Sequence, residues 1–129
     1  MDEAELKSRT KQFALRVMRL VDALPKSIKG RTIGGQLIRS GTSVAANYRA
    51  TCRARSRAEF ISKLGVVVEE ADESALWLEL IVEHKLMQEV LVRPLLREAE
   101  ELTAIMAASR ISASRNSKQP AIANRKSAI

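Results

Sequence analysis

The run from Phe60 to Ile81 constrains the fold of this chain more than any other part of the sequence. Apolar and small residues recur there at alternating spacings of four and three, the period of one face of an α-helix. The members of this face are Phe60, Leu64, Val67, Ala71, Ser74, Leu78 and Ile81. Ser56 and Glu59, directly before the run, have the spacing of a capping box. We therefore predict a helix from this cap to His84, about 40 Å long at 1.5 Å per residue.

Three further segments show helical periodicity. We predict helices from Glu3 to Leu24, from Thr32 to Arg53, and from near Val92 with Pro94 in its first turn. Their core positions are Leu6, Thr10, Phe13, Val17, Leu20 and Leu24, then Ile33, Leu37, Val44 and Tyr48, then Leu95, Ala99, Leu102 and Met106. Glycine disfavours a helix interior by about 1 kcal/mol, and close approach of a neighbouring helix is the usual compensation. We expect such contacts at Gly34, Gly35 and Gly41, and we place Gly30 in the first loop.

Composition supports an all-α fold, because aromatic residues make up 3% of the chain and strands favour aromatic side chains. Four amphipathic helices joined by short links predict an antiparallel up-down four-helix bundle over residues 1–111. Residues 112–129 lose the periodicity and are predicted to be a disordered basic tail. With one cysteine, no secretory signal and no membrane-spanning apolar stretch, we expect a cytoplasmic protein.

Charge is unevenly distributed along the chain. Residues 1–60 carry 13 Lys or Arg against 5 Asp or Glu, whereas residues 61–111 carry 5 against 10. The candidate nucleic-acid-binding residues are Arg39, Arg49, Arg53, Arg55 and Arg57, and the tail adds Arg115, Lys118, Arg125 and Lys126. Arginine pairs with phosphate in a bidentate manner, so a stripe of arginines suits a nucleic-acid backbone. Two alternatives stay open: a solvated face, or arginines that pair with the acidic third helix of a neighbouring copy.

The third predicted helix also has a second apolar face. Val66, Glu73, Trp77 and Leu80 lie roughly opposite its core face at 100° per residue. A helix that is apolar on two sides needs two partners, so these four residues are candidates for a subunit interface. The alternative is that Trp77 folds over the edge of its own bundle.

Several segments together resemble a known family. These segments are the run from Gly35 to Asn47 (GQLIRSGTSVAAN), the run from Glu59 to Leu64 (EFISKL), Glu69-Glu70, Leu76-Trp77-Leu78 and the segment from Leu95 to Met106. The family that they resemble is that of the rRNA intervening-sequence proteins, often called four helix bundle proteins. The resemblance covers roughly Leu6 to Ile111. It departs after Asn47, where the family often has an acidic residue and glycine and this chain has Tyr48 and Arg49.

The resemblance implies a homo-oligomer, characteristically a ring of five, in a bacterial family not known for catalysis. It extends distantly to the accessory protein of diversity-generating retroelements, a basic pentamer that works with a reverse transcriptase and nucleic acid. No cofactor or metal is expected, since a di-iron bundle needs two Glu-x-x-His motifs and the chain has one histidine, His84. Cys52 has basic neighbours that lower a thiol pKa, but no histidine partner for nucleophilic chemistry. We predict a non-enzymatic oligomer that binds structured RNA or a ribonucleoprotein partner; the alternative is a protein-interaction scaffold without a nucleic-acid role.

Overall fold

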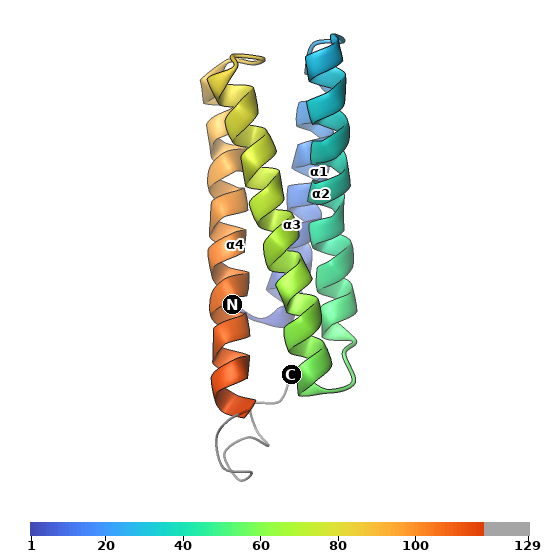
Figure 1. Cartoon of the computed structure of the whole chain (residues 1–129), viewed down its shortest axis with the longest axis vertical. Helices are drawn as coiled ribbons and strands as arrows, with labels where there is room; N and C mark the ends of the chain where they lie inside the picture. The colour runs from blue at the N-terminus through green and yellow to red at the C-terminus, as the bar shows by residue number, and fades with distance from the viewer. Residues whose placement is uncertain (118–129) are drawn as a thin grey trace.

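The structure is a computed structural model that describes residues 1–117, and all regular structure in this range is helical. The helices are α1 (Glu3–Asp22), α2 (Ile28–Cys52), α3 (Arg57–Glu83) and α4 (Glu89–Ser117). Figure 1 shows them side by side along one long axis, with the links at alternating ends. Each helix contacts the next along the chain, and α4 also contacts α1. The predicted all-α fold with four helices is confirmed.

The first link is shorter than predicted because α2 starts at Ile28, four residues before Thr32. Ser27 caps the helix: its hydroxyl accepts a hydrogen bond from the Gly30 N–H at 3.1 Å. The prediction that Gly30 belongs to the loop is therefore wrong. Gly30 lies in the first turn of α2, where a Cβ atom would collide with the carbonyl group of Pro25.

The fourth helix is longer than predicted at both ends. It begins at Glu89, so Pro94 lies in its second turn rather than its first. It continues through residues 112–117, and the predicted start of a disordered tail at Ser112 is wrong. Ala113 is buried there and its carbonyl oxygen accepts a hydrogen bond from Arg57 Nη1 at 3.3 Å, so packing extends the helix. The rest of the predicted tail, residues 118–129, lies outside the described residues.

The third helix follows its prediction, from the Ser56 cap to the C-cap His84. Ser56 Oγ accepts a hydrogen bond from the Glu59 N–H at 3.0 Å, as half of the capping box requires. All predicted core positions of the four helices are buried, except that Ile33 and Phe60 are partly buried against the core. None of the described helices is long and apolar enough to cross a membrane.

Small residues on α2 bring that helix close to both of its neighbours. A Cβ atom on Gly41 would lie 2.8 Å from Cγ2 of Val17 on α1. On the other side, Ser40 Oγ and Ser74 Oγ of α3 share a buried hydrogen bond of 2.8 Å. Close approach is thus confirmed at Gly41, and also at Gly34, where a Cβ atom would lie 3.0 Å from Val21. The prediction of close approach is wrong for Gly35, because the space around its Cβ position is open.

The seam between α1 and α4 is the loosest of the four helix contacts. One ion-pair cluster bridges it near the middle of the bundle. Arg9 donates from Nε and Nη2 to the two carboxylate oxygens of Glu98, each at 2.7 Å. Its Nη2 also donates to Glu101 at 2.7 Å. Because the contact with Glu98 is bidentate, it fixes the orientation of the two helices as well as linking them.

The glycines of α2 provide a matched test of this packing. Gly41→Ala is expected to lower the free energy of unfolding by about 1–3 kcal/mol, because the new methyl group overpacks against Val17. Gly35→Ala should raise it by about 0.5–1 kcal/mol, because the same methyl group meets no neighbour and helix propensity improves. Urea denaturation followed by circular dichroism measures both, and equal effects of the two substitutions would contradict the close contact.

Candidate nucleic-acid interface

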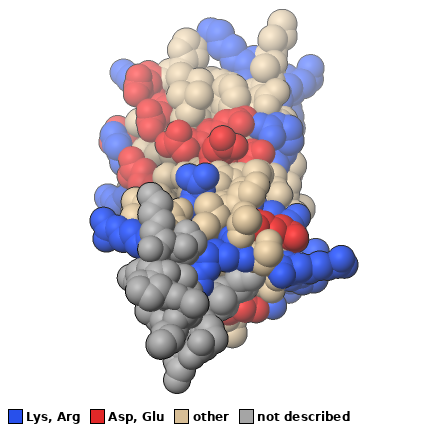
Figure 2. All heavy atoms as spheres, turned by 60° about the horizontal axis from the view of Figure 1, so that its bottom comes forward, with Lys and Arg blue, Asp and Glu red and all other residues tan. Residues whose placement is uncertain are grey.

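Basic side chains gather at the end of the bundle where α2 stops and α3 starts, and Figure 2 shows this end turned toward the viewer. We call Arg49, Arg53, Arg55 and Lys63 the basic end. Arg53, Arg55 and Lys63 line a cleft of about 320 Å³, together with Ala50 and Glu59. Arg49, Arg53 and Arg55 are exposed and make no ion pair within the part of the chain that the structure describes. Their charge is therefore available to an external anion.

The two helix ends explain why these arginines are held together. Arg53 is the C-cap of α2, and its backbone N–H donates to the carbonyl groups of Ala50 and Thr51. Only Arg53, Ala54, Arg55 and Ser56 separate α2 from α3, and Ser56 is already the N-cap of the next helix. Because the link is short and both helix ends are capped, Arg53 and Arg55 are held close together. Positive charge near the C-terminus of α2 is also favoured by the helix dipole.

Two of the five predicted arginines are occupied within the chain. Arg57 at the start of α3 donates to the Ala113 carbonyl of α4. Arg39 in the middle of α2 donates to Glu73 and, at 3.3 Å, to Glu70 of α3. The structure therefore separates Arg39 from the other arginines, since it is about 15 Å from Arg49 along the helix at 1.5 Å per residue. Its positive charge is largely paired with the carboxylates of Glu70 and Glu73 on α3.

The same contact accounts for two residues of the predicted subunit interface. Trp77 Nε1–H donates to Glu73 Oε2 at 3.1 Å, and the indole packs half-buried against the core. Trp77 thus packs at the edge of its own bundle, as the alternative described, and its part in a subunit interface stays a prediction. Hydrogen bonds from Arg39 and then Trp77 hold the pKa of Glu73 below its usual value. Val66 and Leu80, with exposed fractions of 37% and 36%, remain on the outer surface of α3.

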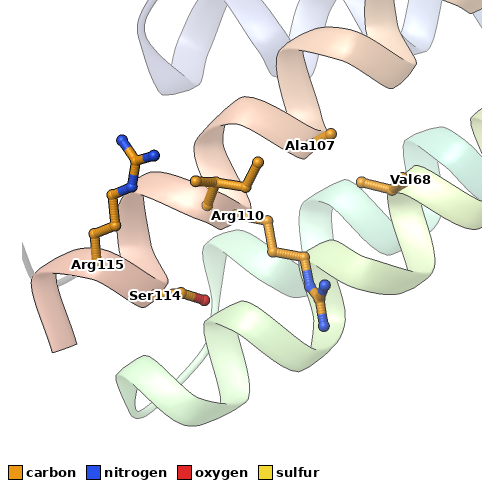
Figure 3. Close-up of a pocket in the computed structure, with 6 residues that line it drawn as sticks. Val68, Ala107, Arg110, Ser114 and Arg115 are labelled. Atoms are coloured by element: carbon orange, nitrogen blue, oxygen red, sulfur yellow. The ribbon is translucent and has the colours of Figure 1, made fainter. Parts of the chain in front are cut away.

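The end of α4 adds two basic residues: Arg110, which the sequence pattern did not indicate, and Arg115, which was predicted to lie in the tail. Arg110 reaches from α4 toward α3, whereas Arg115 points away from α3 (Figure 3). Arg110 Nε donates to the Ile61 carbonyl at 3.1 Å and lies over Gly65, where a Cβ atom would be 3.0 Å from it. Both arginines line a groove of about 390 Å³ with Val68, Ala107, Ile111 and Ser114. The one signal in the sequence was Gly65, a glycine in the middle of the strongest helical pattern.

Comparison with known proteins assigns the family. The family model described as "23S rRNA-intervening sequence protein" matches residues 2–108. The chain belongs to this family. A crystal structure of a protein of unknown function from the S23 ribosomal protein family of Bacteroides thetaiotaomicron is similar, with a TM-score of 0.78 and 30% identity. The match covers 85% of this chain and 98% of that one. No curated protein sequence matches significantly.

In this 23S rRNA-intervening sequence protein, the two residues weighed for catalysis or metal binding lie at helix ends: Cys52 is the last residue of α2, and His84 is the C-cap of α3. Burial raises the pKa of the Cys52 thiol, against the lowering that its basic neighbours suggested. Within the described residues no group of three or more His, Cys, Asp or Glu side chains is placed to hold a metal ion. His84 Nε2 lies 2.9 Å from Lys29 Nζ at the opposite end of the bundle from the basic end.

The single tryptophan allows the Arg39–Glu73 contact to be tested by pH titration. The pKa of Glu73 is lowered in the folded state, so its contribution to stability is present at neutral pH and is lost as the pH falls through the lowered pKa. Tryptophan fluorescence should report this protonation, because the carboxylate accepts the indole hydrogen bond. The midpoint is expected below the usual carboxyl range in the wild type and should rise in Arg39→Ala. Glu73→Gln is the control; a transition that persists in it would contradict the assignment.

Proposed function

We propose that this 23S rRNA-intervening sequence protein is a non-enzymatic homo-oligomer that binds structured RNA, or a ribonucleoprotein partner, through its basic end. The observation that carries the proposal is the cleft at the α2–α3 link. It brings Arg53, Arg55 and Lys63 together beside the exposed Arg49, with none of the three arginines neutralised inside the described chain. In contrast, the arginines at mid-bundle, Arg9 and Arg39, are paired with carboxylates.

The chemistry of this surface favours recognition of phosphate rather than of bases. Arginine presents a planar fork of N–H donors that matches phosphate oxygens, and lysine adds a point charge. Base-specific reading of RNA relies on aromatic side chains that stack on unpaired bases. Here Phe13 and Tyr48 are buried, and Phe60 and Trp77 pack against the core. RNA binding should therefore be electrostatic, dependent on RNA shape and sensitive to salt.

The proposal includes an assembly. The chain is an antiparallel up-down bundle whose copies form a cytoplasmic ring, with five copies expected from the family resemblance. One exposed stripe along α3 supports self-association, and we call it the outer stripe. Its members are Val66, Glu69, Asp72, Leu76, Leu80 and Glu83. They follow spacings of three and four, so three apolar and three acidic side chains share one side of the helix. Val66 and Leu80 of the predicted interface belong to this stripe.

Reversal of the basic end tests the nucleic-acid function. Arg49→Glu/Arg53→Glu/Arg55→Glu is expected to weaken binding to a labelled structured RNA by tenfold or more. It should also reduce the slope of log affinity against log salt by about two to three, since each lost phosphate contact removes about 0.7–0.9 of that slope. Fluorescence anisotropy over a salt series measures both quantities.

A variant of equal net charge controls for non-specific attraction. Lys26→Glu/Arg31→Glu/Arg97→Glu changes three exposed residues away from the basic end that make no ion pair in the described chain. It should retain most of the wild-type affinity. Equal losses in the two variants would contradict a localised site. No binding by the folded wild type at low salt would overturn the nucleic-acid proposal and favour the protein-interaction scaffold.

The assembly makes a separate prediction. Sedimentation equilibrium at micromolar concentration should give a mass several times the 14.3 kDa of one chain. High salt should leave part of the assembly intact, because the apolar members of the outer stripe contribute contacts that salt does not screen. A mass of one chain at every concentration tested would overturn the oligomer.

A further inference from the structure

The loose seam between α1 and α4 contains a groove that the bundle itself leaves open. It has a volume of about 420 Å³ and lies between the last turns of α1 and the first turns of α4. Leu20 and Leu95 form its buried base, and Leu91 is 59% exposed beside them. Arg16 and Arg19 line the α1 side of the groove. We call this site the seam groove.

Both arginines of the seam groove are without a carboxylate partner in the described part of the chain. Further along the same seam, Arg9 is satisfied by Glu98 and Glu101. The seam therefore changes from a closed, neutralised contact at its middle to an open site with an apolar base and a positive wall. Such a site suits an amphipathic helix that carries leucines between acidic residues.

The outer stripe of α3 has this composition. Leu76 and Leu80 are 46% and 36% exposed, and they lie one turn apart. Asp72 precedes Leu76 by four residues and Glu83 follows Leu80 by three, so acidic groups flank the leucine pair on the same side of the helix. Neither acidic residue makes an ion pair in the described chain. Apolar and acidic side chains thus meet a groove that is apolar and basic.

We infer that the outer stripe of one copy docks into the seam groove of the next copy. This inference rests on the proposed homo-oligomer and names its two contacting surfaces. Leu76 and Leu80 cover the base formed by Leu20 and Leu95, while the flanking carboxylates face the guanidinium groups of the groove wall. Burial of the exposed leucines provides the affinity, and the charges provide orientation and register.

The position of the two surfaces in the bundle determines the type of assembly. α3 contacts α2 and α4 but not α1, so its outer stripe and the α1–α4 seam occupy different sides of the molecule. One copy can therefore use both surfaces at once. Contacts of this head-to-tail kind generate a closed ring or an open filament, not a two-fold dimer. The seam groove and the pair Leu76 and Leu80 lie toward the end of the bundle where α1 and α3 stop, whereas Arg49, Arg53 and Arg55 lie toward the opposite end (Figure 1). These three arginines therefore remain available to RNA.

Charge exchange tests the contact. Arg16→Glu/Arg19→Glu should shift the sedimentation mass to that of one chain, and Asp72→Arg/Glu83→Arg should do the same. All four substitutions in one chain restore opposite charges across the contact, so this variant should assemble again. The controls Arg31→Glu/Arg97→Glu and Glu5→Arg/Glu100→Arg change exposed residues that belong neither to the outer stripe nor to the lining of the seam groove, and they should keep the wild-type mass.

The outcomes separate this contact from the proposed function. An oligomeric wild type whose mass neither two-site variant changes overturns the docking contact and leaves the homo-oligomer standing. A folded four-substitution variant that stays a single chain overturns the charge pairing. Should any charge variant lack helical circular dichroism, Leu76→Ser decides: it is expected to weaken assembly at least tenfold, and an unchanged mass contradicts the inference. RNA binding by the basic end is measured independently in each case.

Discussion

In the middle of the bundle, α2 touches α1 and α3 through side chains of minimal size. Gly41 lies against Val17, and Ser40 shares a hydrogen bond with Ser74. Neither hydroxyl is left without a partner, because Ser74 Oγ also donates to the Glu70 carbonyl at 2.9 Å, so the polar pair is tolerated in the buried core. These two contacts place α2 close to both neighbours, and this spacing determines which side chains of α2 can reach the adjacent helices.

One consequence concerns the residue next to Ser40. With the α2 and α3 backbones close together at this level, the Arg39 side chain reaches Glu70 and Glu73 across the helix pair. Glu73 in turn accepts the Trp77 hydrogen bond, so the indole stays against its own bundle. Arg39 and Trp77 were both candidates for contacts with external partners, but here each is hydrogen-bonded within its own chain. As a surface ion pair, this contact contributes little to stability, but it determines which charges remain available.

The charged residues that make no ion pair in the described chain lie in two kinds of place, at one end of the bundle and along its sides. At the α2–α3 link, Arg49, Arg53 and Arg55 lie on or beside a short, capped segment and make no ion pair among the described residues, and Glu59 lines the cleft beside them. They point to an anionic partner at the end of the bundle axis. The lateral surfaces instead offer an acidic and apolar stripe on α3 and a basic and apolar groove between α1 and α4. Assembly through the sides and RNA binding at one end would then proceed without competing for the same residues.

The sequence alone determined the class of fold and most of the core. Helical periodicity is a local property, so it identified which side of each helix is buried and where Ser56 caps α3. The distribution of charge also identified the arginines at the end of α2 as candidates for binding an anion. Helix ends were less accurate, because Ser27 and Ala113 act through contacts that periodicity does not report.

Only the tertiary structure decided which charges are neutralised. Arg9 pairs with Glu98, 89 positions away, and Arg39 pairs with residues more than 30 positions away. The contact between Arg110 and the backbone at Ile61 is similarly distant. Such pairings depend on the relative rotation and spacing of two helices. A periodic pattern specifies the direction in which a side chain points on its own helix, but not the residue that faces it on the next one.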